Sequence, residues 1–157
     1  MTAQRGPTSA VIRLASPEDR PAIEAIVGRA YDPYIARIGR KPGPLLDDYG
    51  ALIHDHKVHV LLAEDTIRGF VVLIPEADAM LLDNVAVDPD AQGRGYGRIL
   101  LDFAERTARA KGFDSIRLYT NEAMSENIAL YSRIGFVETH RAEEKGLRRV
   151  YMAKRIG

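Results

Sequence analysis

The sequence predicts a single α/β domain, in which helices flank a central mixed sheet. The chain has 157 residues, a length that suits one domain with a sizeable core. Apolar residues at every second position indicate strands, and apolar residues three and four apart indicate helices. These patterns predict the order β-α-(α)-β-β-β-α-β-α-β-β. Neither a repeat nor a long linker interrupts this order. We expect the small and polar residues 1–9 to be disordered and residues 10–157 to form the domain.

The first third of the chain predicts a strand, a helix and an irregular stretch. Residues 11–14 read as a strand, and Ser-Pro-Glu-Asp at 16–19 is typical of a helix start, with serine as N-cap and proline at the first helical position. The segments 31–34 and 39–44 contain proline and glycine and predict a loop or a broken helix. A short helix is expected at 45–54.

Alternation and helical spacing predict the remaining elements. The strongest helix signal is the segment 96–111, whose apolar residues recur three and four apart and which is followed by Gly112 as a natural C-cap. Strands are predicted at 58–63, 67–74, 80–87, 115–120, 136–141 and 147–153, a further helix at 125–134, and turns at 64–66 and 144–146.

Composition indicates an ordinary soluble domain. Lys plus Arg and Asp plus Glu number 22 each, so the formal net charge is zero and no general attraction to nucleic acid or to an anionic membrane is expected. The absence of cysteine excludes disulfides, a cysteine nucleophile and a cysteinyl intermediate. No apolar run approaches the length of a membrane span and the N-terminus lacks a signal-peptide core, so we expect a cytoplasmic location.

The segment most informative about function is 80–97, where an apolar strand ends in Asp-Pro and leads through Gln-Gly-Arg-Gly-Tyr-Gly into a helix. Such a turn binds anions, because the first N–H groups of a helix have no partner within it. A P-loop would need Gly-Lys-Ser/Thr, which is absent here, and the dinucleotide fingerprint would need glycine where Arg98 stands. The pattern Q-x-x-G-x-G is matched at every fixed position.

With this loop the sequence resembles the GNAT superfamily of acetyl-CoA-dependent N-acetyltransferases, in which main-chain N–H groups of the loop hold the pyrophosphate of coenzyme A. The segment 129–136, Ala-Leu-Tyr-Ser-Arg-Ile-Gly-Phe, is similar to a second family segment, whose tyrosine faces the coenzyme sulfur. The resemblance is close over about 80–137 and elsewhere extends to the order of elements. It implies a GNAT-like fold with a central mixed, mostly antiparallel sheet flanked by helices.

The resemblance also implies direct attack of an amine on the thioester of acetyl-CoA in a ternary complex. Tyr131 is the candidate general acid, because a phenol with a pKa near ~10 stays protonated at pH 7 and can donate to the leaving thiolate. The alternative is a core tyrosine that packs the helix against the sheet. Asp83 is the candidate base, which period-two alternation places on the same face as Val85 and Val87. A structural ion pair or cap is the alternative role for this carboxylate.

One position departs from the family pattern. Many members carry asparagine seven residues before the tyrosine and a small residue four before it, where this chain has Met124 and Asn127. Both positions lie on nearly the same helix face, so Asn127 could serve the coenzyme from one turn along, or it could be a solvated polar residue. The expected coenzyme-binding residues are Val85, Ala86, Val87, Gln92, Gly93, Arg94, Gly95, Tyr96, Gly97, Arg98, Asn127 and Tyr131.

The acceptor site is less well specified. The segment 31–44 lies where the family varies its acceptor-binding lid. Its basic residues Arg37, Arg40 and Lys41 could bind an acidic acceptor, although a basic loop is more often simply solvated. His54 and His56 are two positions apart instead of four and no cysteine accompanies them, so no metal is expected. The expected substrate-binding residues are Tyr31, Tyr34, Asn84, Tyr119 and Asn121.

The sequence therefore predicts an acyltransferase that moves acetyl from acetyl-CoA to a primary amine, either of a small molecule or of a protein. The amine acceptor is the expected partner, and neither nucleic acid nor a membrane is. The alternative is an acyl-CoA-binding regulatory or toxin-partner module with little turnover, and a nucleotide-binding module is a third hypothesis. A homodimer is left open, because the C-terminal strands could pair with a second copy.

Overall fold

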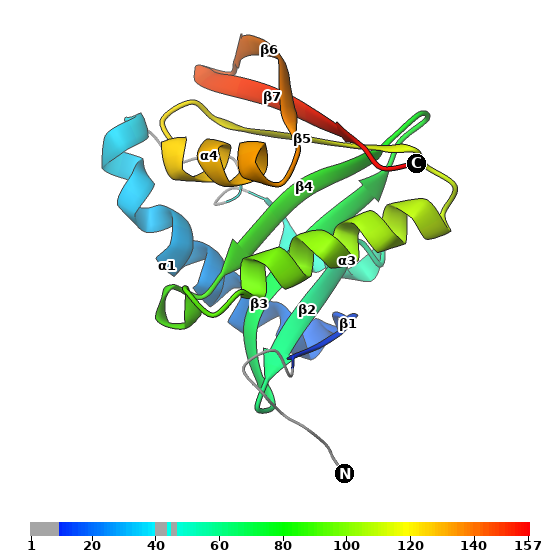
Figure 1. Cartoon of the computed structure of the whole chain (residues 1–157). Coiled ribbons are helices and arrows are strands. Elements are labelled where there is room, and N and C mark those ends of the chain that lie inside the picture. Colours follow the sequence, from blue (N-terminus) through cyan, green and yellow to red (C-terminus); the bar gives the residue numbers. More distant parts are fainter. Residues whose placement is uncertain (1–9, 40–43, 45–46) are drawn as a thin grey trace.

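The computed structural model describes residues 10–39, 44 and 47–157, and its elements follow the predicted order (Figure 1). Residues 1–9, for which we expect disorder, lie outside the described residues. The strands are β1 (Ala10–Leu14), β2 (Val58–Ala63), β3 (Thr66–Pro75), β4 (Met80–Val87), β5 (Ser115–Asn121), β6 (Val137–Glu144) and β7 (Leu147–Arg155). The helices are α1 (Arg20–Ile38), α2 (Tyr49–His54), α3 (Tyr96–Ala110) and α4 (Ser125–Arg133), with 3-10 turns η1 (Pro17–Asp19) and η3 (Pro89–Ala91).

The strands form one seven-stranded sheet in the order β1-β2-β3-β4-β5-β7-β6. Neighbouring strands are antiparallel except β4 and β5, which are parallel. The predicted mixed, mostly antiparallel sheet is thus confirmed. The turns of the β2–β3 and β6–β7 hairpins are two residues long, one shorter than predicted, with positive φ at Glu64, Asp65, Lys145 and Gly146, as in type I′ turns.

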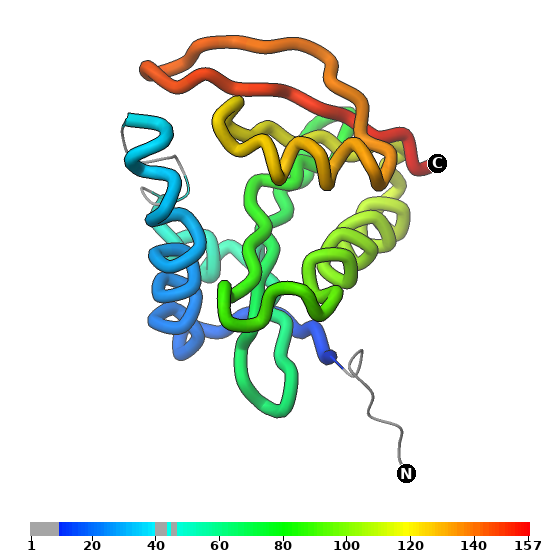
Figure 2. The backbone as a smooth tube through the Cα atoms, turned by 60° about the vertical axis from the view of Figure 1, so that its left-hand side comes forward, coloured from blue at the N-terminus to red at the C-terminus, as the bar shows by residue number. Residues whose placement is uncertain are grey.

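Helices cover both faces of the sheet, and each face has its own hydrophobic core. Figure 2 shows α1 and α3 on opposite sides of β4. The core beneath α1 and α2 includes Ile23, Ile26 and Phe70, whereas the core beneath α3 and α4 includes Leu100 and Met152. This division follows from the alternation of apolar side chains along the central strands, which sends successive residues to opposite faces.

The predicted start of the first helix is confirmed. The backbone N–H of Ser16 donates to Asp19 Oδ2 at 2.8 Å, which completes the capping interaction expected from the Ser-Pro-Glu-Asp pattern. Arg13 on β1 also donates to Asp19, at 2.7 Å. One carboxylate therefore fixes the angle between the first strand and the first helix.

The predicted loop or break at 31–34 is wrong, because α1 continues through Pro33 to Ile38. Proline inside a helix removes one hydrogen bond and costs about 3 kcal/mol, yet tertiary contacts hold the last turns in place. Tyr31 lies in the core on one side of Pro33, and Arg37 on the other side forms an ion pair with Glu126 of α4 at 2.9 Å. The helix ends at Gly39, whose φ of +88° is left-handed.

The helix predicted at 45–54 is shorter in the structure. It begins at Tyr49, after Asp48, whose Oδ1 accepts a hydrogen bond from the N–H of Ala51 at 3.1 Å. Residues 45 and 46 lie outside the described residues. At the end of α3 the C-cap is Lys111, and Gly112, which was predicted to be the C-cap, follows one position later with a left-handed φ of +88°.

Candidate active site

β4 and β5 separate partway along their length. Their parallel pairing extends over Met80–Leu82 and Ile116–Leu118, and a cavity of about 600 Å³ opens beyond that point. This volume is typical of small-ligand sites. The cavity wall also takes residues from α1, α4, β7 and the segment before α2. Of the predicted site residues, those that line it are Tyr31, Asp83, Asn84, Val85, Tyr119, Asn121, Asn127 and Tyr131.

A β-bulge brings Asp83 to the cavity. Two consecutive residues of β3 pair with Leu82 and Asn84, so Asp83 is the extra residue on β4. Leu82 and Val85 both pack against the core beneath α3, although they are three positions apart. The regular alternation that grouped Asp83 with Val85 and Val87 is therefore interrupted, because the prediction assumed an unbroken strand.

Asp83 is a partly buried carboxyl group with an altered proton affinity. Burial, reinforced by the charge of Asp47 and opposed by the Arg149 guanidinium, raises the pKa of Asp83 from 3.8 to about 6. Among the described residues, no hydrogen bond or ion pair engages this carboxyl group. At pH 7 it is mostly ionised, and it binds a proton far better than an ordinary aspartate does.

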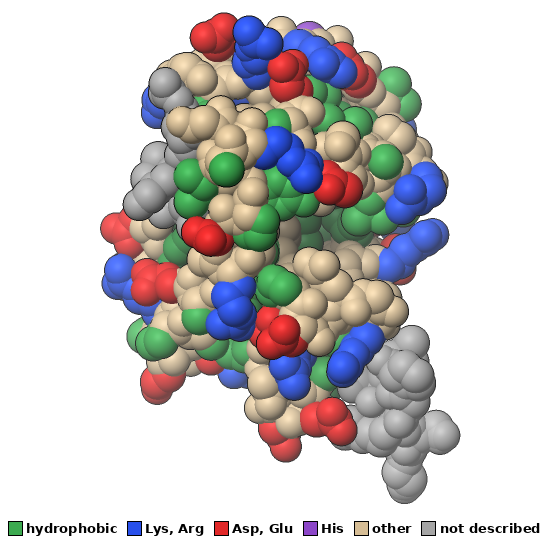
Figure 3. Space-filling model, turned by 90° about the vertical axis from the view of Figure 1, so that its left-hand side faces the viewer, with side chains coloured by type: hydrophobic (Ala, Val, Ile, Leu, Met, Phe, Trp, Pro, Cys, Tyr) green, Lys and Arg blue, Asp and Glu red, His purple; other side chains and the backbone are tan. Residues whose placement is uncertain are grey.

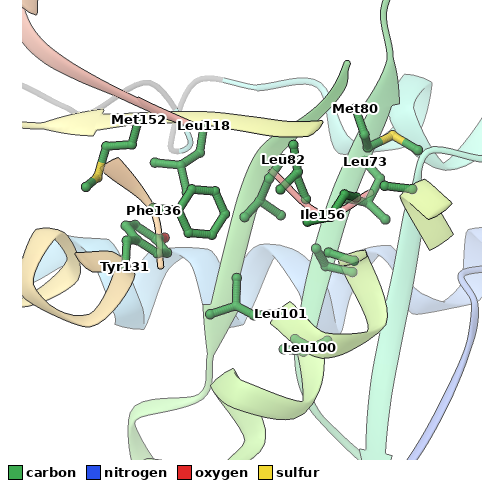
Figure 4. Close-up of a cluster of buried hydrophobic side chains, with 14 of the residues drawn as sticks. Leu73, Met80, Leu82, Leu100, Leu101, Leu118, Tyr131, Phe136, Met152 and Ile156 are labelled. Atoms are coloured by element: carbon green, nitrogen blue, oxygen red, sulfur yellow. The ribbon is translucent and has the colours of Figure 1, made fainter. Parts of the chain in front are cut away.

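Tyr131 contributes a buried phenol from α4. Its side chain is 7% exposed and packs edge-on against Phe136, with ring centroids 5.8 Å apart (Figure 4). Burial raises the pKa of Tyr131 to about 12, so the hydroxyl is protonated at neutral pH. Within the described part of the chain the hydroxyl has no hydrogen-bond partner. It is therefore available to donate a proton into the cavity.

The glycine loop connects β4 and η3 to α3. Gly93 and Gly95 both have a φ of +85°, which favours glycine, and Gly95 is the N-cap of α3. No side chain caps the first N–H groups of α3, and Gln92 to Gly95 are exposed. These N–H groups can therefore receive an anion. The side chain of Tyr96 is buried in the core, so only its backbone can contribute to such binding.

Asp88 anchors the approach to this loop and was missed as a site residue. Its Oδ1 accepts from the N–H of Asp90 at 3.1 Å, and its Oδ2 accepts from Arg29 on α1 at 2.8 Å. The side chain of Asp88 is buried. The Asp-Pro pair at the end of the predicted strand was the available signal, since aspartate caps turns through its side chain.

The other predicted coenzyme-binding residues divide between the cavity and its surroundings. Val85 and Asn127 line the cavity. Ala86 faces the core beneath α1, whereas Val87 packs beneath α3. Among the loop arginines, Arg94 and Arg98 are both exposed.

Tyr31 and Asn84 line the cavity, but their polar atoms bond within the protein. The Tyr31 hydroxyl donates to Asn84 Oδ1 at 2.6 Å, and Asn84 Nδ2 donates to the Tyr49 hydroxyl at 2.9 Å. Tyr49 donates in turn to the carbonyl of Pro44 at 2.6 Å. This chain of bonds ties α1, the bulged strand and the segment before α2 together, so Tyr31 and Asn84 mainly fix the shape of the wall.

The remaining predicted substrate residues differ in their positions. Tyr119 and Asn121 both line the cavity. The Arg149 guanidinium lies over the Tyr119 ring, with its Cζ 4.4 Å from the ring centroid. Tyr34 is not among the lining residues. It lies about one turn after Tyr31 on α1, and the Arg37 Cζ is 4.8 Å from the centroid of its ring. Sequence reasoning missed Asp47, which lines the cavity after a proline-rich segment where no local pattern marks it.

Metal-ligand clusters and membrane-spanning helices were sought among the described residues. No group of three or more His, Cys, Asp or Glu side chains is placed to hold a metal ion within residues 10–39, 44 and 47–157. None of the helices described there is long and apolar enough to cross a bilayer. On the face in Figure 3, acidic and basic side chains are interspersed instead of gathered by sign.

The sheet, the separated parallel strands and the uncapped helix start define an α/β protein with a glycine loop at the start of α3 and a ligand-sized cavity between β4 and β5. The model of the acetyltransferase (GNAT) family matches residues 23–136. The chain belongs to this family, as its resemblance implied.

Two curated relatives are similar over part of the chain. A mycothiol acetyltransferase of Beutenbergia cavernae is 38% identical over 85 residues, which cover 54% of this chain and 27% of the relative. The [ribosomal protein bS18]-alanine N-acetyltransferase of Salmonella typhimurium is 36% identical over 78 residues, which cover 50% of this chain and 53% of the relative. The chain thus matches about a quarter of the first relative and about half of the second.

The fold is also that of solved acetyltransferases. The PaiA N-acetyltransferase from Thermoplasma acidophilum, determined in complex with coenzyme A, superposes with a TM-score of 0.76 at 21% identity. The match covers 94% of this chain and 99% of that chain. The predicted GNAT-like fold is therefore confirmed.

Proposed function

We propose that the protein is an acetyl-CoA-dependent N-acetyltransferase that acts on a primary amine. The observation that carries this proposal is one cavity lined by a carboxyl group with a pKa near 6 and a buried phenol without a partner, on Asp83 and Tyr131. Membership of the GNAT family supports it, as do the names of both curated relatives. The acceptor is the amino group of a small molecule or of a protein.

In this proposal the loop from Gln92 to Arg98 binds the pyrophosphate of the coenzyme. The free N–H groups at the start of α3 and the left-handed glycines allow the backbone to approach an anion closely. The thioester arm enters the cavity beside Val85 and Asn127, where β4 no longer pairs with β5. Unpaired backbone N–H groups of β4 there are suited to polarise the thioester carbonyl.

The chemical step follows from the two titratable groups. Asp83 accepts a proton from the incoming ammonium, and the neutral amine attacks the thioester carbon. The carbon–nitrogen bond forms and the carbon–sulfur bond breaks. Tyr131 donates its proton to the departing sulfur and regains one from the nitrogen, which loses its second proton as the amide forms. The products are the acetylated amine, coenzyme A with a free thiol, and one proton.

Release of the coenzyme A thiol in the presence of an amine panel tests this function. The panel includes small aliphatic amines and short peptides with free N-termini, and mass spectrometry identifies the acetylated product. Amine-dependent thiol release is the expected result. Tight binding of acetyl-CoA without turnover of any amine would favour the acyl-CoA-binding module instead, and stabilisation by ATP or NAD in place of acetyl-CoA would favour a nucleotide-binding module.

A further inference from the structure

The charged groups in the cavity wall differ in whether they have partners. Two carboxylates and two cations line the cavity, namely Asp47, Asp83, Lys145 and Arg149. Arg149 forms an ion pair with Glu144 at 2.9 Å, and Lys145 is not free either. Neither carboxylate forms a hydrogen bond or an ion pair with any residue that the structure describes. The charge left without a partner in the cavity is therefore negative.

The two carboxylates act on the same part of the cavity from different elements. Asp83 lies on the bulge of β4, and Asp47 lies on the segment that leads into α2. Burial is the main cause of the raised pKa values of Tyr49 and Tyr119, and the negative charges of both carboxylates raise them further. The charge of Asp47 also acts on Asp83 itself. Arg149 offsets part of this like-charge repulsion, because its charge opposes the rise in the pKa of each carboxyl group, yet both pKa values remain raised. A further cation is therefore favourable in this space.

A third group in the cavity also lacks a partner. Tyr131 is 7% exposed, and its hydroxyl has no hydrogen-bond partner among the described residues. Groups that are satisfied within the protein do not call for a ligand, whereas this hydroxyl and the partly buried Asp83 carboxylate do. Asp47 is exposed at the cavity, where it can meet a cation that enters from solvent. The wall also contains Leu118 and Leu147, which suit an aliphatic segment of the ligand better than a further charge.

We propose that the acceptor carries a second positive charge, separated by an aliphatic spacer from the amine that is acetylated, and that Asp47 binds this distal cation while Asp83 serves the reacting amine. The proposal rests on the N-acetyltransferase function and narrows its substrate class to diamines and other amines with a distal cation. The reacting ammonium gives a proton to Asp83 and forms its bond to the acetyl carbon, as described above. The distal ammonium keeps its proton throughout, so Asp47 is a binding residue and takes no part in bond making.

Three acceptors with the same four-carbon spacer test this assignment. They are 1,4-diaminobutane, butylamine and 4-aminobutanoate, whose distal groups are positive, neutral and negative. The kcat/KM for thiol release by the full chain should be about tenfold higher for the diamine than for butylamine, after division by two for its equivalent amines. That ratio corresponds to about 1.4 kcal/mol, somewhat above the roughly 1 kcal/mol at the upper end for exposed ion pairs. The aminobutanoate should be the poorest acceptor.

Matched variants assign the preference to one side chain. Asp47→Asn should bring the ratio of diamine to monoamine close to one, and Asp47→Glu should retain most of it. Asp102→Asn removes the same charge from the exposed face of α3 and should leave the ratio unchanged. Equal kcat/KM values for the three acceptors, or a ratio that survives Asp47→Asn, would overturn the proposal.

If none of the three acceptors is turned over, binding of 1,4-diaminobutane, measured by thermal shift, tests the role of Asp47. With coenzyme A present, 1,4-diaminobutane should raise the Tm of the wild type more than that of Asp47→Asn. Absence of this difference would overturn the inference about the second charge. Failure of the proposed function has a different signature: either acetyl-CoA alone would produce no thermal shift, or it would bind without thiol release in the presence of any amine of the panel.

Discussion

Replacing Asp83 with asparagine should change activity and stability in opposite directions. The pKa of Asp83 is about 6 in the folded protein, against a usual value of 3.8. The folded state therefore binds this proton more readily than the unfolded chain does. The contribution of Asp83 to the free energy of unfolding is greatest below about pH 4 and falls as the pH rises through about 6. Above that pH the ionised carboxylate destabilises the fold.

The size of this effect follows from the pKa difference. A shift of about two units corresponds to about 3 kcal/mol, which is an upper limit because the cavity admits solvent that screens the charge. Asparagine has no charge at any pH, so Asp83→Asn should raise the free energy of unfolding at pH 7.5 by about 1–2 kcal/mol. In a protein of this length that corresponds to a Tm increase of roughly 2–8 °C. At pH 4 the variant and the wild type should have similar stabilities.

Activity should respond in the other direction. The kcat/KM of the wild type should fall about tenfold per pH unit below pH 6, because only the ionised carboxylate accepts the proton. Asp83→Asn should lose most of its activity and this acid limb, while Asp102→Asn should retain both. Thermal unfolding and initial rates at a series of pH values measure the two effects on the same samples. A variant that keeps the acid limb, or that is less stable than the wild type at pH 7.5, would refute the reasoning.

Three further substitutions, one of them with a matched control, test other parts of the molecule. Tyr131→Phe should lower kcat by about 100-fold, at the low end for a general acid, with acetyl-CoA affinity unchanged in titration calorimetry; an unchanged kcat would exclude Tyr131 as the acid. Gly95→Ala should cost about 1–2 kcal/mol at a left-handed φ of +85° and weaken acetyl-CoA binding, whereas Gly28→Ala, with open space around its Cβ, should stabilise α1 by about 0.5–1 kcal/mol. If Gly95→Ala and Gly28→Ala changed acetyl-CoA binding equally, the assignment of the glycine loop to coenzyme binding would be contradicted. The His59 ring packs on Phe103, and burial lowers its pKa, so its protonation destabilises the fold as the pH falls below 6.5. His59→Phe should therefore reduce the loss of Tm between pH 7.5 and pH 5, and an equal loss in both proteins would speak against this role.

The elements that could be predicted from sequence are those governed by local periodicity. Alternation identified β4 with its observed bounds, and three-and-four spacing identified α3 to within one residue. The continuation of α1 through Pro33 could not be predicted, because proline is unfavourable locally and the compensating contacts come from elsewhere in the fold.

The candidate site was predictable where a motif defines it. The glycine pattern at 92–97 and the segment around Tyr131 led to the loop and to the buried phenol. The bulge at Asp83 escaped prediction because it depends on register with β3, which no single strand encodes. Asp47 escaped because its place in the wall depends on tertiary packing of the segment before α2, which no local pattern encodes.

Isothermal titration of the protein with acetyl-CoA tests the central claim most directly. Saturable binding with a Kd in the micromolar range is the predicted result, accompanied by stabilisation of about 2.7 kcal/mol at a hundredfold excess over Kd. Gly95→Ala should weaken this binding, and Gly28→Ala should leave it unchanged. If the titration gave no heat and acetyl-CoA produced no thermal shift, the glycine loop would be only a connector. The proposed function would then be wrong as well.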